Sequence, residues 1–492
     1  MKKILTLLLA LTMLLSTLLL AGCGDKKDDA TDDTTGEQNI TLGGDSEDES
    51  TTLGLPAGLK FNDVFNVLVW KAWVDEFGTT PFQDGDDVER AMVERDQYVE
   101  GLLGIEFEYT QADGNYEHRN EFLNLVSESV MISNKTWDLI CGYSMCPPQL
   151  AMQDLLVDLN TVDYIDYTKA WYPEFMVDAC TINEKTYFIT GDISTNSLYA
   201  MQAVAFSSSA AEESGLHEDD LYQLVYDDEW TIEKMFEITQ DLGRAGSDGI
   251  WDETDFYPVI TSNTACIDSF YFSAGLKMIE VGENGVLKVS DDVMSETAMD
   301  IYSILYAGKA THKNFATYEN REKALQDGKC IFSISPVINF RVYWTDAKEA
   351  FRILPFPKYQ KDDPYQTYLS MWCSQYCIPG DIDDPDRTGA VMEALGYANY
   401  HTVTPLIFEE SMKLRYSENP DCAAMFDIMR NGRTYDISSL FGIAFEGKGY
   451  SGYAFMRYMV VEEDTDWVSR YKNDFESNLN RVVSELNQFF AK

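Results

Sequence analysis

Three short apolar segments, separated by two helical patterns, constrain the fold of this chain more than any other feature of its sequence. Residues 65–70 are almost wholly apolar, which is typical of a strand buried on both faces of a parallel sheet. Residues 105–109 alternate between apolar and charged side chains, as a strand does, and residues 137–141 form a third strand-like segment. Between them, residues 88–103 and 122–130 repeat apolar side chains at helical spacing. This order predicts a βαβαβ unit, whose short connections favour right-handed crossovers and a parallel sheet.

Strand and helix patterns alternate again in the rest of the chain, which at 492 residues is long enough for two or more packed domains. Thr231 is expected to cap a helix; Trp230 precedes this cap, and Met235 lies four residues after it, the spacing of a hydrophobic staple. We therefore interpret Trp230 as a packing residue rather than a ligand contact. Further strands are expected at residues 203–206, 330–334, 351–354 and 367–378, with a mostly helical remainder from residue 387.

The first residues have the pattern of an export signal. Lys2 and Lys3 precede an apolar run that is interrupted by Thr and Ser and falls short of the roughly 20 apolar residues of a membrane-spanning helix. The Leu-Ala-Gly-Cys ending at Cys23 resembles a bacterial lipobox, which implies removal of residues 1–22 and a lipid on the Cys23 sulfur. An uncleaved signal anchor is the alternative, but it leaves this ending unexplained. We therefore expect an extracellular protein that is lipid-anchored to the cell membrane.

The segment after Cys23 cannot form a core, because it is rich in Asp, Glu, Thr, Ser and Gly and has almost no large apolar residues. We expect residues 23–60 to be the lipidated cysteine and an acidic, disordered tether. The whole chain carries a formal net charge of −46, which would repel phosphate backbones and anionic headgroups. We therefore do not expect nucleic acid to be a partner.

Eight cysteines remain besides Cys23. An even number in an exported protein permits disulfides, but a chain of this size does not need them. Cys373 and Cys377 lie in a segment predicted to be extended, which would place them about 13 Å apart, too far to pair. We expect buried thiols, with one or two disulfides as the alternative.

Few motifs indicate catalysis or metal binding. Zinc-protease, Walker and G-x-S-x-G patterns are absent, and the four histidines are not paired at ligand spacing. Residues 447–452 match G-x-G-x-x-G, but not in the first turn of a βαβ unit, so we interpret them as a loop. Residues 244–255 have the outline of a calcium loop, but Arg244 and Gly246 occupy its first two ligand positions. We interpret this segment as a polar turn and expect no metal or cofactor.

Several segments carry a resemblance to a known family. Residues 183–192 and 199–211 resemble the stretch in which chains of this family first cross between lobes. Residues 221–231, which end in Trp-Thr, resemble the start of a helix in the family, and residues 353–358 (Ile-Leu-Pro-Phe-Pro-Lys) resemble its return crossing. Residues 391–397 and 435–437 resemble its C-terminal pattern. From about residue 60 to the end, the chain resembles the extracellular solute-binding proteins of family 1, sugar-binding lipoproteins of ABC importers, in the large form of Gram-positive anaerobes. One departure is Ser207-Ser208-Ser209, where relatives usually carry Asn-Lys.

The resemblance implies an α/β chain with the two-lobe, periplasmic-binding-protein-like type II fold. Its hinge would consist of two or three chain crossings, and its lobes would close over a ligand in the interlobe cleft. We expect residues 61–198 and 350–400 to form the first lobe, and residues 199–349 and 401–492 to form the second. The implied ligand is a carbohydrate, in particular an oligosaccharide, that a monomeric receptor delivers to the permease subunits of an ABC transporter.

Ligands of such folds lie at the carboxyl ends of the strands, and this geometry selects candidate binding residues. For each aromatic candidate the alternative is core packing, which is less favoured for Trp73 because its neighbours are polar. The candidates are Trp70 and Trp73 after the first strand, Tyr143 and Ser144 after the third, Asp192 and Asn196 at the first crossing, Asp268 and Tyr271 in the second lobe, and Ser335 and Trp372.

Two other functional classes remain open at this point. An extracellular carbohydrate-active enzyme could share the anchor and the aromatic residues, although 83 acidic side chains produce paired carboxylates by chance. A receptor for a peptide or another non-sugar solute is also compatible with the family, which does not fix the ligand. We expect a binding protein rather than an enzyme.

Overall fold

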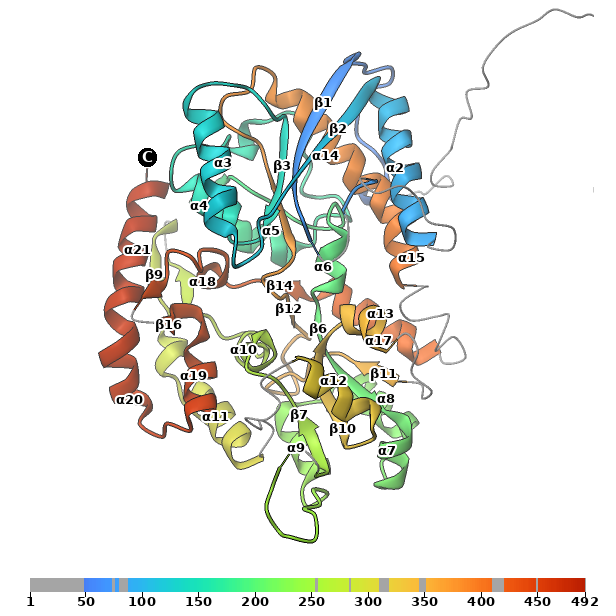
Figure 1. The fold of residues 1–492 in the computed structure, drawn as a ribbon, viewed down its shortest axis with the longest axis vertical. Helices are drawn as coiled ribbons and strands as arrows, with labels where there is room; N and C mark the ends of the chain where they lie inside the picture. The colour runs from blue at the N-terminus through green and yellow to red at the C-terminus, as the bar shows by residue number, and fades with distance from the viewer. Residues whose placement is uncertain are drawn as a thin grey trace, which may run out of the picture. The chain divides into compact units, whose positions relative to one another are not determined.

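Two four-stranded sheets organise the protein (Figure 1). The structure is a computed structural model that describes residues 48–72, 76–78, 87–252, 255–282, 285–308, 318–344, 351–408, 420–447 and 450–491. The predicted signal segment, Cys23 and most of the predicted tether lie outside the described residues. The expectation that the tether extends to residue 60 is wrong for its last part, because Leu53, Leu55 and Leu59 pack against the core.

The first sheet contains the predicted βαβαβ unit. β1 (Asp63–Trp70) pairs in parallel with β2 (Ile105–Ala112) and with β3 (Leu139–Tyr143). α2 (Asp87–Leu103) and α3 (Arg119–Met131) lie between these strands in the chain. The last four residues of β1 and all of β3 are buried, as their continuous apolar character predicts. The predicted unit is therefore confirmed.

Later segments complete this part of the molecule. β13 (Ser374–Cys377) pairs antiparallel with β3, so the predicted strand at residues 367–378 is only partly strand. α14 (Pro385–Ala398) packs on α2 and is buried throughout its last eleven residues, from Thr388 onward. α15 (Thr404–Phe408) also packs on α2. The expected start of the second lobe at residue 401 is therefore wrong for this helix, because its packing partner belongs to the first lobe.

The second sheet has the strand order β11-β6-β10-β7. β6 (Gln202–Ser207) pairs antiparallel with β10 (Cys330–Pro336) and with β11 (Phe351–Leu354), and β10 pairs in parallel with β7 (Tyr257–Ile260). Both β6 and β10 are fully buried, as central strands should be. The expectation that residues 350–400 belong to the first lobe is wrong for β11, because its hydrogen bonds go to β6. A short apolar strand does not by itself indicate which sheet it joins.

Three short segments of the described chain, called here the connecting passages, lie between the two sheets (Figure 1). α6 (Thr195–Tyr199) leads into β6, and β12 (Thr367–Tyr368) lies between β11 and β13 in the chain. β14 (Arg433–Thr434) is the third passage and pairs in parallel with β12. Arg433 also forms an ion pair with Asp192 of the first passage. These contacts join the three passages into one connecting layer, which matches the expected hinge of two or three crossings.

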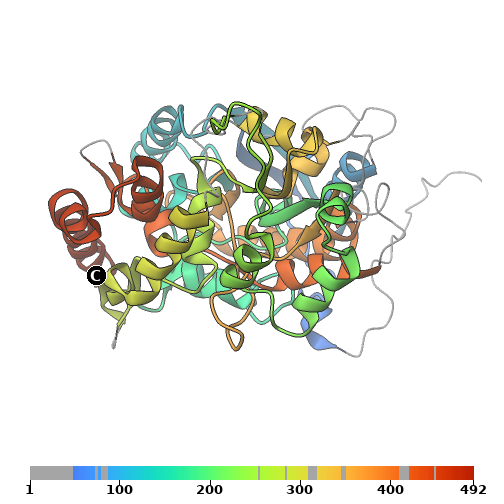
Figure 2. The same cartoon turned by 90° about the horizontal axis from the view of Figure 1, so that it is seen from below.

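The C-terminal helices pack mainly against the second lobe. α19 (Phe455–Glu462) contacts both α10 (Ala265–Phe272) and α11 (Glu296–Gly308). Figure 2 shows this group from below, with the red C-terminal helices beside the yellow-green α11. The other elements of this region are α17 (Pro420–Asn431), α18 (Ile437–Leu440), β15 (Glu446–Gly447), β16 (Tyr450–Ser451), α20 (Trp467–Arg470) and α21 (Glu476–Phe490).

Two further expectations about the core are confirmed. Thr231 caps α9 (Ile232–Thr239) by accepting a hydrogen bond from the Lys234 N–H, and Trp230 is fully buried. All eight cysteines after Cys23 are buried free thiols. The remaining elements are α4 (Cys146–Ala151), α5 (Glu174–Cys180), β4 (Thr181–Ile182), β5 (Lys185–Thr186), α7 (Ser208–Glu213), α8 (Glu218–Tyr226), β8 (Ile279–Val281), β9 (Leu287–Val289), α12 (Tyr318–Gln326) and α13 (Ile338–Val342).

Candidate functional site

A cavity of about 450 Å³ lies where strand ends from both sheets meet. This volume falls within the range of about 300–1,000 Å³ that is usual for small-molecule sites. Seven of the residues that line it are aromatic. The lining consists of Trp70, Asn115, Tyr116, Glu117, Tyr143, Thr264, Ala265, Pro336, Ile338, Asn339, Tyr343, Ser370, Met371, Trp372, Ser451, Tyr453, Arg457 and Tyr458.

The first sheet places aromatic side chains at the carboxyl ends of its parallel strands. Trp70 is the last residue of β1, and Tyr143 is the last residue of β3. Their rings pack edge to face with centroids 5.3 Å apart, and the Trp70 Nε1–H donates a hydrogen bond to Ser374 Oγ at 2.8 Å. Tyr116, in the loop after β2, is 43% exposed. The first two rings are therefore fixed in the wall, whereas Tyr116 is open to solvent.

The second sheet and the connecting layer contribute mostly polar groups. Pro336 ends β10, and Asn339 lies in the following helix α13. Thr264 caps α10 by accepting a hydrogen bond from the Cys266 N–H. Ser370 accepts a hydrogen bond from the Gln202 side-chain amide, and Trp372 follows it in the link to β13 as a half-buried residue. The cavity thus combines aromatic faces with hydroxyl and amide groups.

One guanidinium reaches the cavity from the C-terminal helices. Arg457, in α19, has a side chain that is 17% exposed and pairs with the buried carboxylate of Asp268 in α10. Its Nε–H donates to Asp268 Oδ1 at 3.0 Å, and Nη2 donates to Oδ2. Burial raises the pKa of Asp268, while the adjacent guanidinium opposes that shift. Two-point pairing favours the ionised carboxylate, because both of its oxygens act as acceptors.

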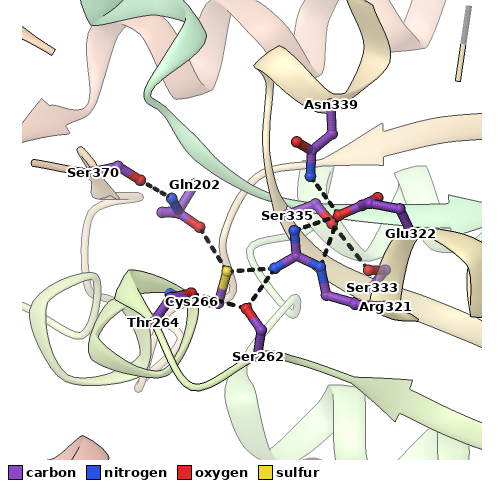
Figure 3. Close-up of polar contacts among 10 residues, drawn as sticks. All are labelled: Gln202, Ser262, Thr264, Cys266, Arg321, Glu322, Ser333, Ser335, Asn339 and Ser370. Carbon is purple, nitrogen blue, oxygen red and sulfur yellow. Dashed lines mark hydrogen bonds and ion pairs between the residues drawn. The ribbon is translucent and has the colours of Figure 1, made fainter. Parts of the chain in front are cut away.

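A buried polar network (Figure 3) includes three lining residues of the cavity, Thr264, Asn339 and Ser370. Arg321, in α12, donates to the carboxylate of the neighbouring Glu322 through Nε at 2.8 Å. Its Nη1 also donates to Ser262 Oγ at 2.9 Å and to Cys266 Sγ at 2.7 Å. Glu322 in turn accepts a hydrogen bond from Asn339 Nδ2 at 2.5 Å. The network therefore holds a lining residue, Asn339, in a fixed orientation.

The structure brings three of the predicted ligand residues to the cavity: Trp70, Tyr143 and Trp372. Asp268 lies behind the lining and acts on it through Arg457. Trp73 lies outside the described residues, so its predicted role stays a prediction.

The other predicted ligand residues do not line the cavity, and each has at least one polar group engaged within the buried framework. Asp192 pairs with Arg430 and Arg433, the Asn196 N–H donates to Glu76, Ser144 donates to the Met371 carbonyl oxygen, Tyr271 donates to the Lys277 carbonyl oxygen, and Ser335 contacts the Ser333 hydroxyl.

Several lining residues were missed by the sequence analysis. Tyr116 follows the second predicted strand, so the strand-end argument applied to that strand would have found it. Tyr453, Arg457 and Tyr458 belong to a region whose sequence indicates only helices. Their position is set by the packing of α19 on α10 and α11, which no local pattern indicates. Ser451 also lines the cavity, although the glycine-rich motif around it was interpreted as a loop.

The calcium-like segment forms a polar turn in its described part. Asp255 accepts hydrogen bonds from the N–H groups of Gly246 at 2.6 Å and Asp252 at 2.7 Å. Asp248 accepts another from the Ile250 N–H at 3.0 Å. Across the part of the chain that the structure describes, no group of three His, Cys, Asp or Glu residues is placed to hold a metal ion.

Comparison with solved structures identifies the architecture. A cyclo/maltodextrin-binding protein in complex with maltotetraose is similar at a TM-score of 0.57 and 13% identity, over 85% of this chain and 97% of the other. A Listeria monocytogenes ABC substrate-binding protein in complex with cycloalternan has a TM-score of 0.52 and 12% identity, over 86% and 100%. The present chain has the ABC substrate-binding-protein fold. This fold has two α/β lobes and a cleft between them, so the predicted fold class is confirmed.

The substrate-binding-protein fold accommodates different ligands. UgpB from Mycobacterium tuberculosis, in complex with glycerophosphocholine, is similar at a TM-score of 0.53 and 12% identity, over 86% of this chain and 98% of UgpB. No family model and no curated protein matches the sequence. Within the described residues, no helix is both long and apolar enough to cross a bilayer.

Proposed function

We propose that this protein is an extracellular substrate-binding lipoprotein that captures an oligosaccharide between its lobes and delivers it to the permease of an ABC transporter. The observation that carries the proposal is the cavity with seven aromatic side chains at the strand ends of the two sheets. Sugar rings present C–H groups that pack on aromatic faces, and their hydroxyls require hydrogen-bonding partners. Trp372, Tyr116 and Tyr458 are open enough to offer a ring face, and Asn339, Thr264 and Ser370 offer polar atoms.

The fold supports this proposal. Similar structures were solved with maltotetraose and cycloalternan, both of which are carbohydrates. We further propose that the protein acts as a monomer whose lobes close over the ligand about the three connecting passages. The lipid on Cys23 would hold this receptor at the outer face of the cell membrane, close to its permease.

The lining supports a receptor over a glycosidase. Glycosidases commonly use two carboxyl groups, separated by about 5–5.5 Å in retaining enzymes or 6.5–9.5 Å in inverting ones. Among the described lining residues, Glu117 is the only carboxylate. Asp268 lies behind the lining, and Arg457 occupies its carboxylate. This lining offers binding groups rather than an acid and base pair.

A thermal-shift screen against neutral oligosaccharides tests the proposal, with maltotetraose, cellotetraose and mannotetraose as first probes and glycerophosphocholine as a non-sugar probe. A ligand at 100 times its dissociation constant should stabilise the protein by about 2.7 kcal/mol. Bound sugar should then be recovered chemically unchanged after denaturation. Turnover of the sugar would support the enzyme alternative, and stabilisation by glycerophosphocholine alone would support a receptor for another solute.

A further inference from the structure

Charged groups around the cavity are arranged in pairs of opposite sign. Arg457 is held by Asp268 at the lining, and Arg321 is held by Glu322 in the buried polar network. We propose that Asp268 is a specificity determinant that makes the cavity reject anionic glycans, because it cancels the charge of the guanidinium that reaches the ligand. This inference rests on the proposed function and defines the ligand further, as an uncharged glycan.

Arg457 engages both carboxylate oxygens of Asp268. Both Asp268 oxygens accept hydrogen bonds from the guanidinium, and Asp268 is only 1% exposed. The Arg457 side chain remains 17% exposed, so the pair meets the cavity through its positive partner. A guanidinium in this position can donate hydrogen bonds to sugar hydroxyls. It does not supply an uncompensated charge to a carboxylate, sulfate or phosphate group on a ligand.

The buried polar network adds no free positive charge. Arg321 is fully buried and contacts Glu322 through both Nε and Nη2 (Figure 3). Glu322 also accepts from Asn339 Nδ2, which leaves the Asn339 side-chain oxygen as an acceptor and one Nδ2 hydrogen as a donor. The Asn339 amide is uncharged, so it offers hydrogen bonds to a ligand without a positive charge to balance a ligand carboxylate.

The residues near the cavity on the first-lobe side likewise include a cation that is paired with a carboxylate. Arg119, in α3, pairs with Glu446 of β15 at 2.8 Å, and Tyr116 donates to the same carboxylate at 3.1 Å. Glu117, an exposed lining residue, carries a further negative charge. An anionic ligand would lose hydration on entering and would meet no uncompensated cation among these groups. That loss would weaken its binding relative to an uncharged ligand of the same shape.

The test compares one glycan in two charge states. The probes are the neutral tetrasaccharide found by the screen and the same molecule with its primary hydroxyls oxidised to C6 carboxylates. Calorimetry would measure both dissociation constants at low and at physiological salt. For the wild type we expect the neutral form to bind at least about tenfold more tightly, with less discrimination at high salt.

Two single substitutions should move this ratio in opposite directions. Asp268→Asn leaves the Arg457 charge uncompensated and should shift the preference toward the carboxylated glycan. Arg457→Gln leaves the Asp268 charge uncompensated and should increase the rejection. The double variant Asp268→Asn/Arg457→Gln restores neutrality, so it should keep a ratio close to that of the wild type even where a single variant folds poorly. Glu462→Gln, which breaks the Arg470 pair at the end of α19, is the control for a general charge effect.

The outcomes separate this inference from the function on which it rests. Tighter binding of the carboxylated glycan by the wild type would overturn the inference and leave the carbohydrate receptor intact. An unchanged ratio in Asp268→Asn would also overturn it, because the ion pair would then be only structural. A protein that binds neither charge form of any glycan would contradict the proposed function itself, and this inference with it.

Discussion

Tryptophan side chains at different depths should respond differently to truncation. Trp372 lines the cavity and is half-buried, whereas Trp230 is fully buried and donates a hydrogen bond to the Pro355 carbonyl oxygen at 2.9 Å. We expect Trp372→Ala to weaken oligosaccharide binding by about 1.5–3 kcal/mol, or roughly ten- to a hundredfold, with little loss of stability. Trp230→Ala should instead lower the free energy of unfolding by about 3–5 kcal/mol. Calorimetry and urea unfolding of both variants would measure these quantities; unchanged affinity in a folded Trp372→Ala protein would remove this ring from the site.

A single buried carboxyl should make stability depend on pH. Burial raises the pKa of Glu393 in α14 from 4.5 to about 7. The folded protein holds this proton more tightly than the unfolded chain does, because the pKa is higher in the folded state. The free energy of unfolding therefore has its full contribution from Glu393 below pH 4.5 and loses it as the pH rises through about 7. The shift corresponds to about 3 kcal/mol.

Glu393→Gln keeps the shape of this side chain and removes its titration. We expect the variant to be more stable than the wild type by up to about 3 kcal/mol at pH 8, with a much smaller difference at pH 4. Urea unfolding of both proteins at pH 4, 6 and 8 would measure the difference. Glu485→Gln, at an exposed pair with Arg481, is the control and should show little pH-dependent effect. A constant difference between wild type and Glu393→Gln at all three pH values would contradict the prediction.

At the scale of the helix, packing decides the sign of a glycine substitution. Gly101 lies in α2 and has open space where an alanine methyl group would stand, since no neighbouring atom lies within 4 Å of a Cβ at this position. A Cβ at Gly389 in α14 would lie 2.4 Å from the Asp163 carbonyl oxygen. We expect Gly101→Ala to stabilise the protein by about 0.5–1 kcal/mol, because alanine favours the helix. Gly389→Ala should destabilise it by about 1–3 kcal/mol, since α14 must move away from this oxygen.

Urea unfolding of the two glycine variants measures both effects in the same molecule. Opposite signs would show that close packing of α14, rather than intrinsic helix propensity, controls the second site. Stabilisation by Gly389→Ala would mean that the helix can shift outward at low cost.

At the scale of the whole molecule, attachment to the membrane should depend on one atom, the Cys23 sulfur. Cys23→Ala should release the protein from membranes without changing its melting temperature or its affinity for the glycan, because the substituted residue lies far along the chain from the cavity residues. Fractionation after a salt wash would measure the release. Thr41→Ala, in the same acidic stretch, is the control and should stay with the membrane. Retention of the Cys23→Ala protein in the membrane fraction would support the signal-anchor alternative instead.

The sequence alone determined the parts of the fold that depend on local order along the chain. The pattern of residues 65–141 was sufficient for the parallel pairing of β1 with β2 and β3, because strand and helix periods differ and short connections allow few topologies. The cap at Thr231, the burial of Trp230 and the free thiols were likewise predictable from neighbouring residues and chain length. Trp70 and Tyr143 could be placed at the cavity because the end of a parallel strand is visible in the sequence.

Tertiary structure decided the partners that lie far apart in the chain. β11 joined the second sheet and α15 packed on α2, and both results depend on surfaces that no local pattern describes. Asp192 lies at the first crossing, where we expected it to bind ligand, but Arg430 and Arg433, more than two hundred residues later, occupy its carboxylate. Arg457 reaches the cavity only because α19 packs on α10, which also supplies Asp268. The sequence gives the type and the local spacing of each side chain directly. The oppositely charged partner of a buried charge is determined by which distant elements pack together.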